Sequence, residues 1–302
     1  MPASILVSFD NSLGARDALA LGHLLSDTLQ RDLAAAWVTP WPGDGYADPD
    51  CRPASGIYER ATHIFDGARA ALGEGVAFDP LTVDAPSVPS GLYEVAERID
   101  PTVLVVGAPH RGAVGRVLVG DIAQHLLHGA PCPVAVAPRG FADVPEPALV
   151  DIGIAVGEHD PLPAMVDFGV ELAHACHGRL HLLASADVTG VKHGVLTPEL
   201  DKASRTRRDA TLEAARSAVD GAIDVTEHSS EGEAADELIR ASETLDLLVC
   251  GSRGYGPLGA VLMGSVSARV VRNAACPVLV LPRAAKAAGA PRPMATAGAT
   301  SG

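Results

Sequence analysis

The chain has 302 residues, enough for two domains that each bury a core of their own. Hydrophobic residues make up 47% of the sequence and aromatic residues only 4%, a composition that favours helices packed on buried parallel strands over a β-sandwich. The formal net charge of -14 argues against nucleic acid and anionic membranes as partners, because an acidic surface repels phosphate groups.

The predicted elements come in the same order in two halves of the chain. Each half starts with a short apolar strand and continues with alternating amphipathic helices and strands, as the spacing of the apolar residues indicates. In the first half, strands are predicted at residues 5–9, 33–38 and 76–83, with helices at 58–72 and 90–99. In the second half, strands are predicted at residues 152–156, 180–184 and 223–228, with helices at 202–219 and 234–243.

A fourth strand follows in each half, at residues 103–106 and 247–250, and every residue in it is apolar. A strand that is apolar on both faces must be covered on both faces, which indicates the centre of a parallel sheet. A glycine-rich loop, a last helix and a fifth strand ending in proline complete each half. Five strands alternating with four helices predict a doubly wound, Rossmann-like α/β domain with a five-stranded parallel sheet, present twice in tandem.

The two halves are copies of one sequence unit. Residues 105–139 align without a gap on residues 249–283, so that Gly107 corresponds to Gly251 and Gly120 to Gly264. A shared register of glycines over this length indicates duplication. We expect a first domain at residues 1–140, a linker at 141–149, a second domain at 150–283 and a disordered tail at 284–302.

The cysteines and the apolar runs bear on where the protein works. The five cysteines include no Cys-x2-Cys pair, so neither a disulfide framework nor a zinc site is expected. Cys132 and Cys276 each open the fifth strand of their half and are predicted to be small core residues. No apolar run approaches the roughly 20 residues that span a bilayer, and the strand beginning at Ile5 leaves no room for a signal peptide. We expect a soluble, cytoplasmic protein.

The glycine-rich loop of the second half is suited to phosphate. The fourth strand leads into Gly251-Ser-Arg-Gly254, and Gly264-Ser265 then starts the last helix. Glycines after a strand allow the backbone to approach a ligand closely, and the free N–H groups of a helix start bind anions. Serine hydroxyls in this helix and the Arg253 guanidinium would add donors and positive charge. Ligands of open α/β sheets bind at the carboxyl ends of the strands, where this loop is expected.

The loop resembles the Gly-x2-Gly-x9-Gly-Ser/Thr motif that nucleotide-binding members of the universal stress protein family carry after the fourth strand. Gly251, Gly254, Gly264 and Ser265 match that motif at every position. The turn Asp10-Asn11-Ser12 is similar to the family's Asp-Gly-Ser, and both halves share its Cys-Pro-Val fifth strand. The resemblance covers both halves. It implies an adenine-nucleotide-binding or sensing module, often dimeric, with little or no catalytic turnover.

On this resemblance, the ligand is ATP, with or without Mg²⁺, and the protein is a regulatory stress-response module without catalysis. The two halves would pair within the chain, either alone or with further formation of a homodimer. The expected nucleotide site consists of Cys250, Gly251, Arg253, Gly254, Gly264, Ser265, Val266 and Ser267.

Each half lacks one part of the expected site. In the first half, His110 stands at the second glycine and Asp121 at the serine, and the Asp121 carboxylate would repel a phosphate by about 1–4 kcal/mol. In the second half, Gly157 stands where the first half has Asp10 and where the family places a base-pocket aspartate. A second, weaker site in the first half would consist of Ser8, Asp10, Val38, Val106, Gly107 and Gly120.

Three alternative functions are open. Gly157 and Asp121 favour a scaffold for dimerisation or interaction whose nucleotide pockets have decayed. A weak ATPase rests on analogy alone, because the loop contains no evident general base or metal ligand. The stretch 254–259 matches the Gly-x-Gly-x2-Gly pattern of nicotinamide enzymes, but it follows the fourth strand rather than the first, which argues against that interpretation.

Two other clusters are expected to be ordinary surface features. His174, Cys176, His177 and His181 are interpreted as residues of a helix end and its surroundings rather than as a metal site, because no carboxylate of suitable spacing adjoins them. The basic run Arg-Thr-Arg-Arg at 205–208 is expected to be a solvated helix face. No metal site is predicted.

Overall fold

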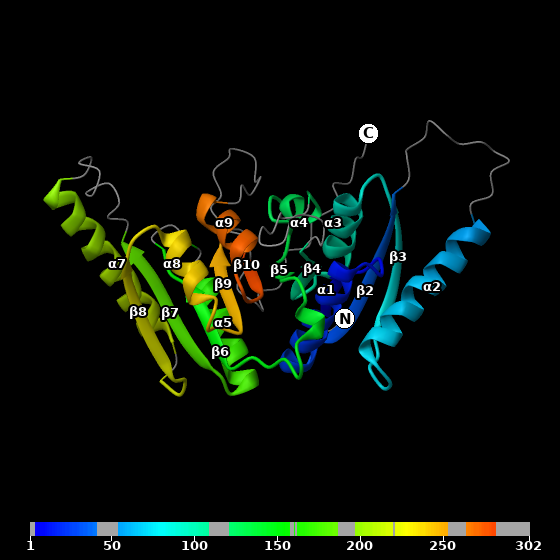
Figure 1. Cartoon of the computed structure of the whole chain (residues 1–302), viewed down its shortest axis with the longest axis horizontal. Helices are drawn as coiled ribbons and strands as arrows, with labels where there is room; N and C mark the ends of the chain where they lie inside the picture. The colour runs from blue at the N-terminus through cyan, green and yellow to red at the C-terminus, as the bar shows by residue number, and fades with distance from the viewer. Residues whose placement is uncertain are drawn as a thin grey trace, which may run out of the picture.

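The computed structural model describes residues 4–40, 54–108, 121–157, 160, 162–186, 197–219, 221–252 and 264–281. Figure 1 shows the elements in place. The first half contains β1 (Ser4–Ser8), α1 (Leu13–Leu29), β2 (Asp32–Pro40), α2 (Ala54–Leu72), β3 (Asp79–Ala85), α3 (Val88–Ile99), β4 (Val103–Gly107), α4 (Asp121–Leu126) and β5 (Val134–Ala137). A 3-10 helix η2 (Phe141–Asp143) follows. The second half contains β6 (Asp151–Ala155), α5 (Leu162–Cys176), β7 (Arg179–Ala186), α7 (Pro198–Ala218), β8 (Val225–Glu231), α8 (Ala234–Ala241), β9 (Leu247–Gly251), α9 (Ser265–Asn273) and β10 (Val278–Leu281).

The strands of the described residues all join one ten-stranded sheet, in the order β3-β2-β1-β4-β5-β10-β9-β6-β7-β8. Within each half the strands are parallel, and the two halves meet at an antiparallel pair in which Val278 lies opposite Val136. The order within each half is that of a doubly wound sheet. The predicted fold, two tandem domains of this type, is confirmed.

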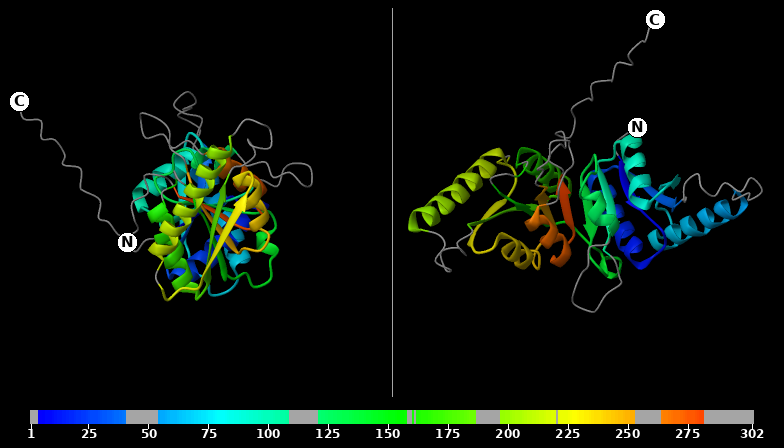
Figure 2. Two further views of the ribbon diagram at one scale, coloured as in Figure 1. Left: turned by 90° about the vertical axis from the view of Figure 1, so that its left-hand side faces the viewer. Right: turned by 90° about the horizontal axis from the view of Figure 1, so that it is seen from above.

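Helices cover both faces of the sheet (Figures 1 and 2). One apolar cluster contains residues of α1, α2, α5 and α7, and a second cluster on the other face contains residues of α3, α4, α8 and α9. Alternate residues of a strand enter opposite clusters, so Val105 packs in the first and Leu104 in the second. This arrangement explains why β4 and β9 are apolar at every position: both are central strands with two covered faces.

The edge strands β3 and β8 differ most from the sequence-based prediction. Both begin and end a few residues later than predicted, at Asp79–Ala85 and Val225–Glu231. Most residues of β8 are exposed, and β3 alternates between exposed and buried near its end. An edge strand has one neighbour and a wet face, so its bounds follow the register with β2 or β7 rather than a run of apolar residues.

The segment predicted as the linker packs against the first half. Phe141 and Leu149 are buried in the same cluster as helix α1. The carboxylate of Asp17, which is 2% exposed, accepts hydrogen bonds from the N–H groups of Gly140 (3.1 Å) and Ala142 (2.9 Å). Sequence patterns gave no sign of this role, because an aspartate in a helix usually faces solvent. The proposed domain boundaries themselves stay a prediction.

A chain of hydrogen bonds crosses the second half at the amino ends of its strands. Nε2 of His181 lies 2.8 Å from Oδ1 of Asp151, and Nδ1 of His181 lies 3.0 Å from Nε2 of His228. Hydrogen bonds from His181 and Arg179 lower the pKa of Asp151, and burial together with the nearby His181 lowers the pKa of His228. The spacing of residues in the sequence could not reveal this carboxylate, because Asp151 is distant from His181 in sequence but belongs to the neighbouring strand.

We expect Asp17→Ala to lower the free energy of unfolding by about 2–4 kcal/mol, because two buried N–H groups lose a charged acceptor. Urea denaturation followed by circular dichroism measures the change. Asp27→Ala is the matched control on the same helix, where the side chain is 71% exposed, and should change stability by less than about 0.5 kcal/mol. Equal midpoints for the two variants would contradict the anchoring role of Asp17.

The lowered pKa values predict a loss of stability in acid. A group whose pKa is lower in the folded state stabilises the fold above its unfolded pKa, about 6.5 for His and 3.9 for Asp, and this contribution disappears as the pH falls. The melting temperature of the wild type should therefore fall between pH 7 and 5 because His228 becomes protonated. It should fall further below pH 5 because Asp151 becomes protonated. His228→Gln should flatten the first interval and Asp151→Asn the second. A control, His63→Gln on the exposed face of α2, should keep the wild-type slope.

Candidate functional site

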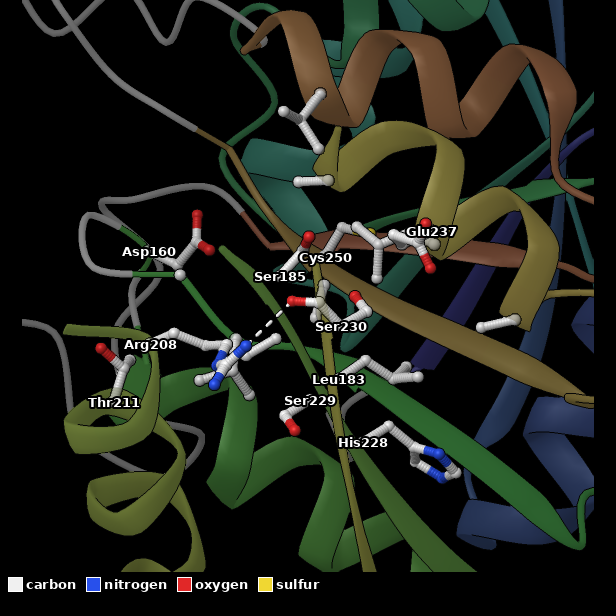
Figure 3. Close-up of a pocket in the computed structure, with 18 of the residues that line it drawn as sticks. Asp160, Leu183, Ser185, Arg208, Thr211, His228, Ser229, Ser230, Glu237 and Cys250 are labelled. Carbon is white, nitrogen blue, oxygen red and sulfur yellow. Dashed lines mark hydrogen bonds between the residues drawn. The ribbon is translucent and has the colours of Figure 1, made fainter. Parts of the chain in front are cut away.

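A cavity of about 1100 Å³ opens in the second half at the carboxyl ends of β6, β7 and β9. Its walls come from α7 on one face of the sheet and from α8 and the start of α9 on the other (Figure 3). β6 and β9 are neighbours, and the chain leaves them toward opposite faces, so the cavity lies at the point where the winding of this half reverses. Open α/β sheets bind ligands at this position.

The described members of the predicted nucleotide site all line this one cavity. Cys250 and Gly251 are contributed by the end of β9, and Gly264 precedes the first turn of α9. Arg253 and Gly254 lie outside the described residues. The remaining lining members of the predicted set are Ser265, Val266 and Ser267.

The start of α9 presents backbone donors to the cavity. Gly264 is the N-cap residue, and the helix has no side-chain cap hydrogen bond. The first intrahelical bond runs from the Ala268 N–H to the Gly264 carbonyl. The N–H groups of Ser265, Val266 and Ser267 come before that bond and have no acceptor within the helix. Together with the helix dipole, they form an environment that favours a negative charge.

Ser267 ties this helix start to the sheet. Its hydroxyl donates a buried 2.6 Å hydrogen bond to the carbonyl oxygen of Gly251. The hydroxyl proton is engaged there, so the exposed Ser265 is the serine of the pair that is accessible to a ligand. The sequence-based prediction assigned both serines to the nucleotide site. It did not distinguish the serine that bonds to the sheet from the serine that is accessible.

Cys250 is an apolar part of the wall. Its side chain is 2% exposed, and burial raises the pKa of its thiol far above the ordinary value. The thiol therefore stays protonated at neutral pH and is a poor nucleophile. Cys132 and Cys276 are buried in the second apolar cluster, as predicted, and burial raises the pKa of each to about 12.

A carboxylate also lines the cavity beside Gly157. The side chain of Asp160 approaches this glycine so closely that a Cβ added to Gly157 would lie 2.4 Å from Oδ2 of Asp160. The Asp160 N–H donates to the Gly157 carbonyl at 3.2 Å, which folds the turn after β6 back on itself. Sequence reasoning compared residue 157 with residue 10 and missed Asp160 because the acid stands three positions later.

Helix α7 contributes a polar wall. Ser204, Arg207, Arg208 and Thr211 line the cavity, and their spacing places them on one side of the helix. The Arg208 side chain is only 12% exposed, and its Nη1 donates to the carbonyl of Ser230 on β8 at 3.1 Å. The prediction of a solvated face was wrong for Arg208, because its side chain is directed toward β8 and is mostly buried there.

The weaker site predicted in the first half has a different environment. A Cβ on Gly107 would lie 1.8 Å from the carbonyl oxygen of Gly14, so the first turn of α1 packs directly on the end of β4. Asp10 accepts a 3.0 Å hydrogen bond from the N–H of Ser12, the N-cap residue of α1. Gly120 lies outside the described residues. The other described members are half-buried Ser8 and buried Val38 and Val106.

Neither a metal-binding cluster nor a membrane-spanning helix is found among the described residues. Among the described residues, no group of three or more His, Cys, Asp or Glu side chains could hold a metal ion. None of the described helices is both long enough and apolar enough to cross a membrane.

Comparison with known proteins places the whole chain in one family. The family model "Usp: Universal stress protein family" matches residues 1–138 and 151–282. A universal stress protein of Mycolicibacterium smegmatis is 30% identical over 299 residues, covering 92% of this chain and 96% of the relative. The crystal structure of a putative universal stress protein from Pseudomonas aeruginosa matches with a TM-score of 0.63 at 18% identity, covering 93% of both chains.

A shorter solved structure, the universal stress protein from Archaeoglobus fulgidus in complex with dAMP, covers 44% of this chain and 97% of its own at 21% identity, with a TM-score of 0.35. The family model spans both halves, and the relative that is 30% identical spans almost the whole chain. The chain is a member of the universal stress protein family with two tandem domains of that family.

Proposed function

We propose that the second half binds an adenine nucleotide, ATP, and that the chain works as a regulatory stress-response module rather than as an enzyme. The observation that carries this proposal is the start of α9, where three backbone N–H groups without acceptors in the helix border a large cavity. Phosphates would lie against these groups, with Gly251 and Gly264 allowing close approach of the backbone.

The sequence motif supports the same ligand. Gly251, Gly254, Gly264 and Ser265 have the spacing that nucleotide-binding universal stress proteins show after their fourth strand. The net charge of -14 repels phosphate in general, so binding depends on local donors rather than on the overall field of the protein. ATP bound at α9 would order the start of that helix and bias the adjoining strands β9 and β10, which is a regulatory effect that needs no chemistry.

The first half would act mainly as a partner for pairing. Its loop carries Asp121 in place of a serine, and its strand β4 ends directly against Gly14 of α1. These features disfavour the binding of a triphosphate by the first half. Its main contribution would then be the surface that pairs with the second half. A nucleotide-free scaffold is the alternative for the whole chain, and the first half is the part of the molecule that favours it.

Ser265→Asp tests the phosphate site. An acidic residue in the first turn is compatible with a helix, but its charge would repel the phosphate by about 1–4 kcal/mol and weaken ATP binding about 10-fold or more. Isothermal titration with ATP measures the affinity. Ser265→Asn, which is neutral and of nearly the same size, is the matched control and should bind within about threefold of wild type. If the wild type binds no ATP at millimolar concentration, the proposed nucleotide site is wrong and the nucleotide-free scaffold is the function that stands.

We also expect no steady release of phosphate from ATP. The buried thiol of Cys250 is protonated, so the cavity wall at the end of β9 supplies no base. The rate of phosphate release is measured by incubating the wild type and the Ser265→Asp variant with ATP over hours and assaying free phosphate in both. Release by the wild type well above that of the variant would show catalysis at this site and contradict the regulatory interpretation.

A further inference from the structure

The turn between β6 and α5 brings a carboxylate back to the end of β6. Gly157 leaves space at the position where the first half carries Asp10, and the Asp160 carboxylate lies within 2.4 Å of where a side chain on residue 157 would begin. Asp160 lines the cavity, as Figure 3 shows. The second half has no acid at the position that corresponds to Asp10, but the carboxylate of Asp160 lies next to that position.

Backbone hydrogen bonds hold Asp160 in this place. Its N–H donates to the carbonyl of Gly157 at 3.2 Å, and its own carbonyl accepts from the N–H of Leu162, the first residue of α5, at 2.8 Å. These two bonds hold the backbone of Asp160 relative to Gly157 and to the first residue of α5. A residue whose backbone is held in this way loses less freedom when it binds a ligand.

Asp160 lies beside Gly157, which follows strand β6. β6 and β9 are parallel neighbours, with Ile154 opposite Val249, so the residues after β6 lie next to the end of β9 at Cys250 and Gly251. Cys250 directly precedes Gly251, whose carbonyl is bonded to the first turn of α9. In a nucleotide whose phosphates lie against α9, the sugar is the unit attached to the phosphates, and we expect it at the neighbouring end of β6 where Asp160 lines the cavity.

The chemistry of a carboxylate restricts what it can meet there. An ionised carboxylate only accepts hydrogen bonds, and it repels a nearby phosphate by about 1–4 kcal/mol. Its presence in an anion-binding cavity favours a ligand only where that ligand presents hydrogen-bond donors. Ribose presents two adjacent hydroxyl donors, and acidic residues at strand ends bind ribose in this manner in other nucleotide-binding sheets.

We propose that Asp160 accepts hydrogen bonds from the 2′- and 3′-hydroxyls of ribose, so that the cavity selects ribonucleotides over nucleotides that lack these hydroxyls. This inference rests on the proposed nucleotide site at α9. It assigns a specificity-determining role to a residue outside the glycine loop.

The test compares ATP with 2′,3′-dideoxy-ATP by isothermal titration. The wild type should bind ATP about 10-fold or more tightly than the dideoxy compound, because hydrogen bonds to a charged acceptor are lost. Asp160→Ala and Asp160→Asn should weaken ATP binding and bring the ratio of the two affinities close to one. Glu243→Gln removes the same charge from the exposed rim of the same cavity and should keep the wild-type ratio.

A relocated carboxylate gives the sharpest check. Gly157→Asp alone would place a second carboxylate next to that of Asp160, and two like charges this close repel each other and a bound phosphate, so this single variant should lose affinity for both nucleotides. Gly157→Asp combined with Asp160→Ala relieves that repulsion and returns an acid to the end of β6, and it should regain a preference for ATP. Thermal unfolding of each variant confirms that the fold is retained.

The outcomes separate the two proposals. If the wild type binds both nucleotides equally, or if Asp160→Ala changes both affinities by the same factor, the ribose role is wrong while the nucleotide site stands. Tighter binding of both nucleotides by Asp160→Ala would show that the carboxylate only repels phosphate, which also overturns the inference. A wild type that binds neither nucleotide overturns the proposed function and this inference with it.

Discussion

The structure depends on the antiparallel pairing of β5 with β10. Each of these strands has four residues, all of them buried, and three residue pairs connect them. A five-stranded parallel sheet alone would expose the edge of its fifth strand, and an exposed apolar edge tends to pair with other chains. Here the two copies cover this edge for each other, so one polypeptide contains the contact that separate copies would make between chains.

This pairing leaves the two halves free to diverge. The shared strand pair needs only short apolar segments, which both halves retain at Val134–Ala137 and Val278–Leu281. Residues at the carboxyl ends of the other strands have no part in it. The second half keeps an open cavity beside α9, whereas in the first half the first turn of α1 packs against Gly107. Duplication with a fixed interface would therefore allow one domain to bind a ligand, as we propose for the second half, while its copy serves the assembly.

The sequence predicted the features that depend on local pattern. Continuous apolar runs identified β4 and β9 as central strands, and the repeated glycines identified the duplication. The edge strands β3 and β8 were placed a few residues early, because their bounds follow pairing with a neighbour and not hydrophobicity. The sequence also could not predict contacts between residues that are far apart in the chain. The contact of His181 with Asp151 forms only because β6 and β7 lie side by side.

The candidate site shows the same division. Its glycine motif was found because the spacing of the residues carries the signal, and the described members do line one cavity. Asp160 and Arg208 were not found, since each reaches the cavity through a turn or a helix whose path is set by packing. An alignment by position pairs residue 157 with residue 10 and finds no acid at 157. The structure shows that the carboxylate of Asp160 lies next to where a side chain on residue 157 would begin.

The buried contact of Asp17 with the segment after β5 has a wider consequence. It fastens η2 to α1, and α1 in turn contacts β4 and helix α5 of the other half. Arg31, two residues after α1, forms an ion pair with Glu171 of α5. We expect parts connected in this way to unfold together rather than one after the other. By mass action, any small molecule held in the second half would then shield the first half from proteases as well, although it touches none of its atoms.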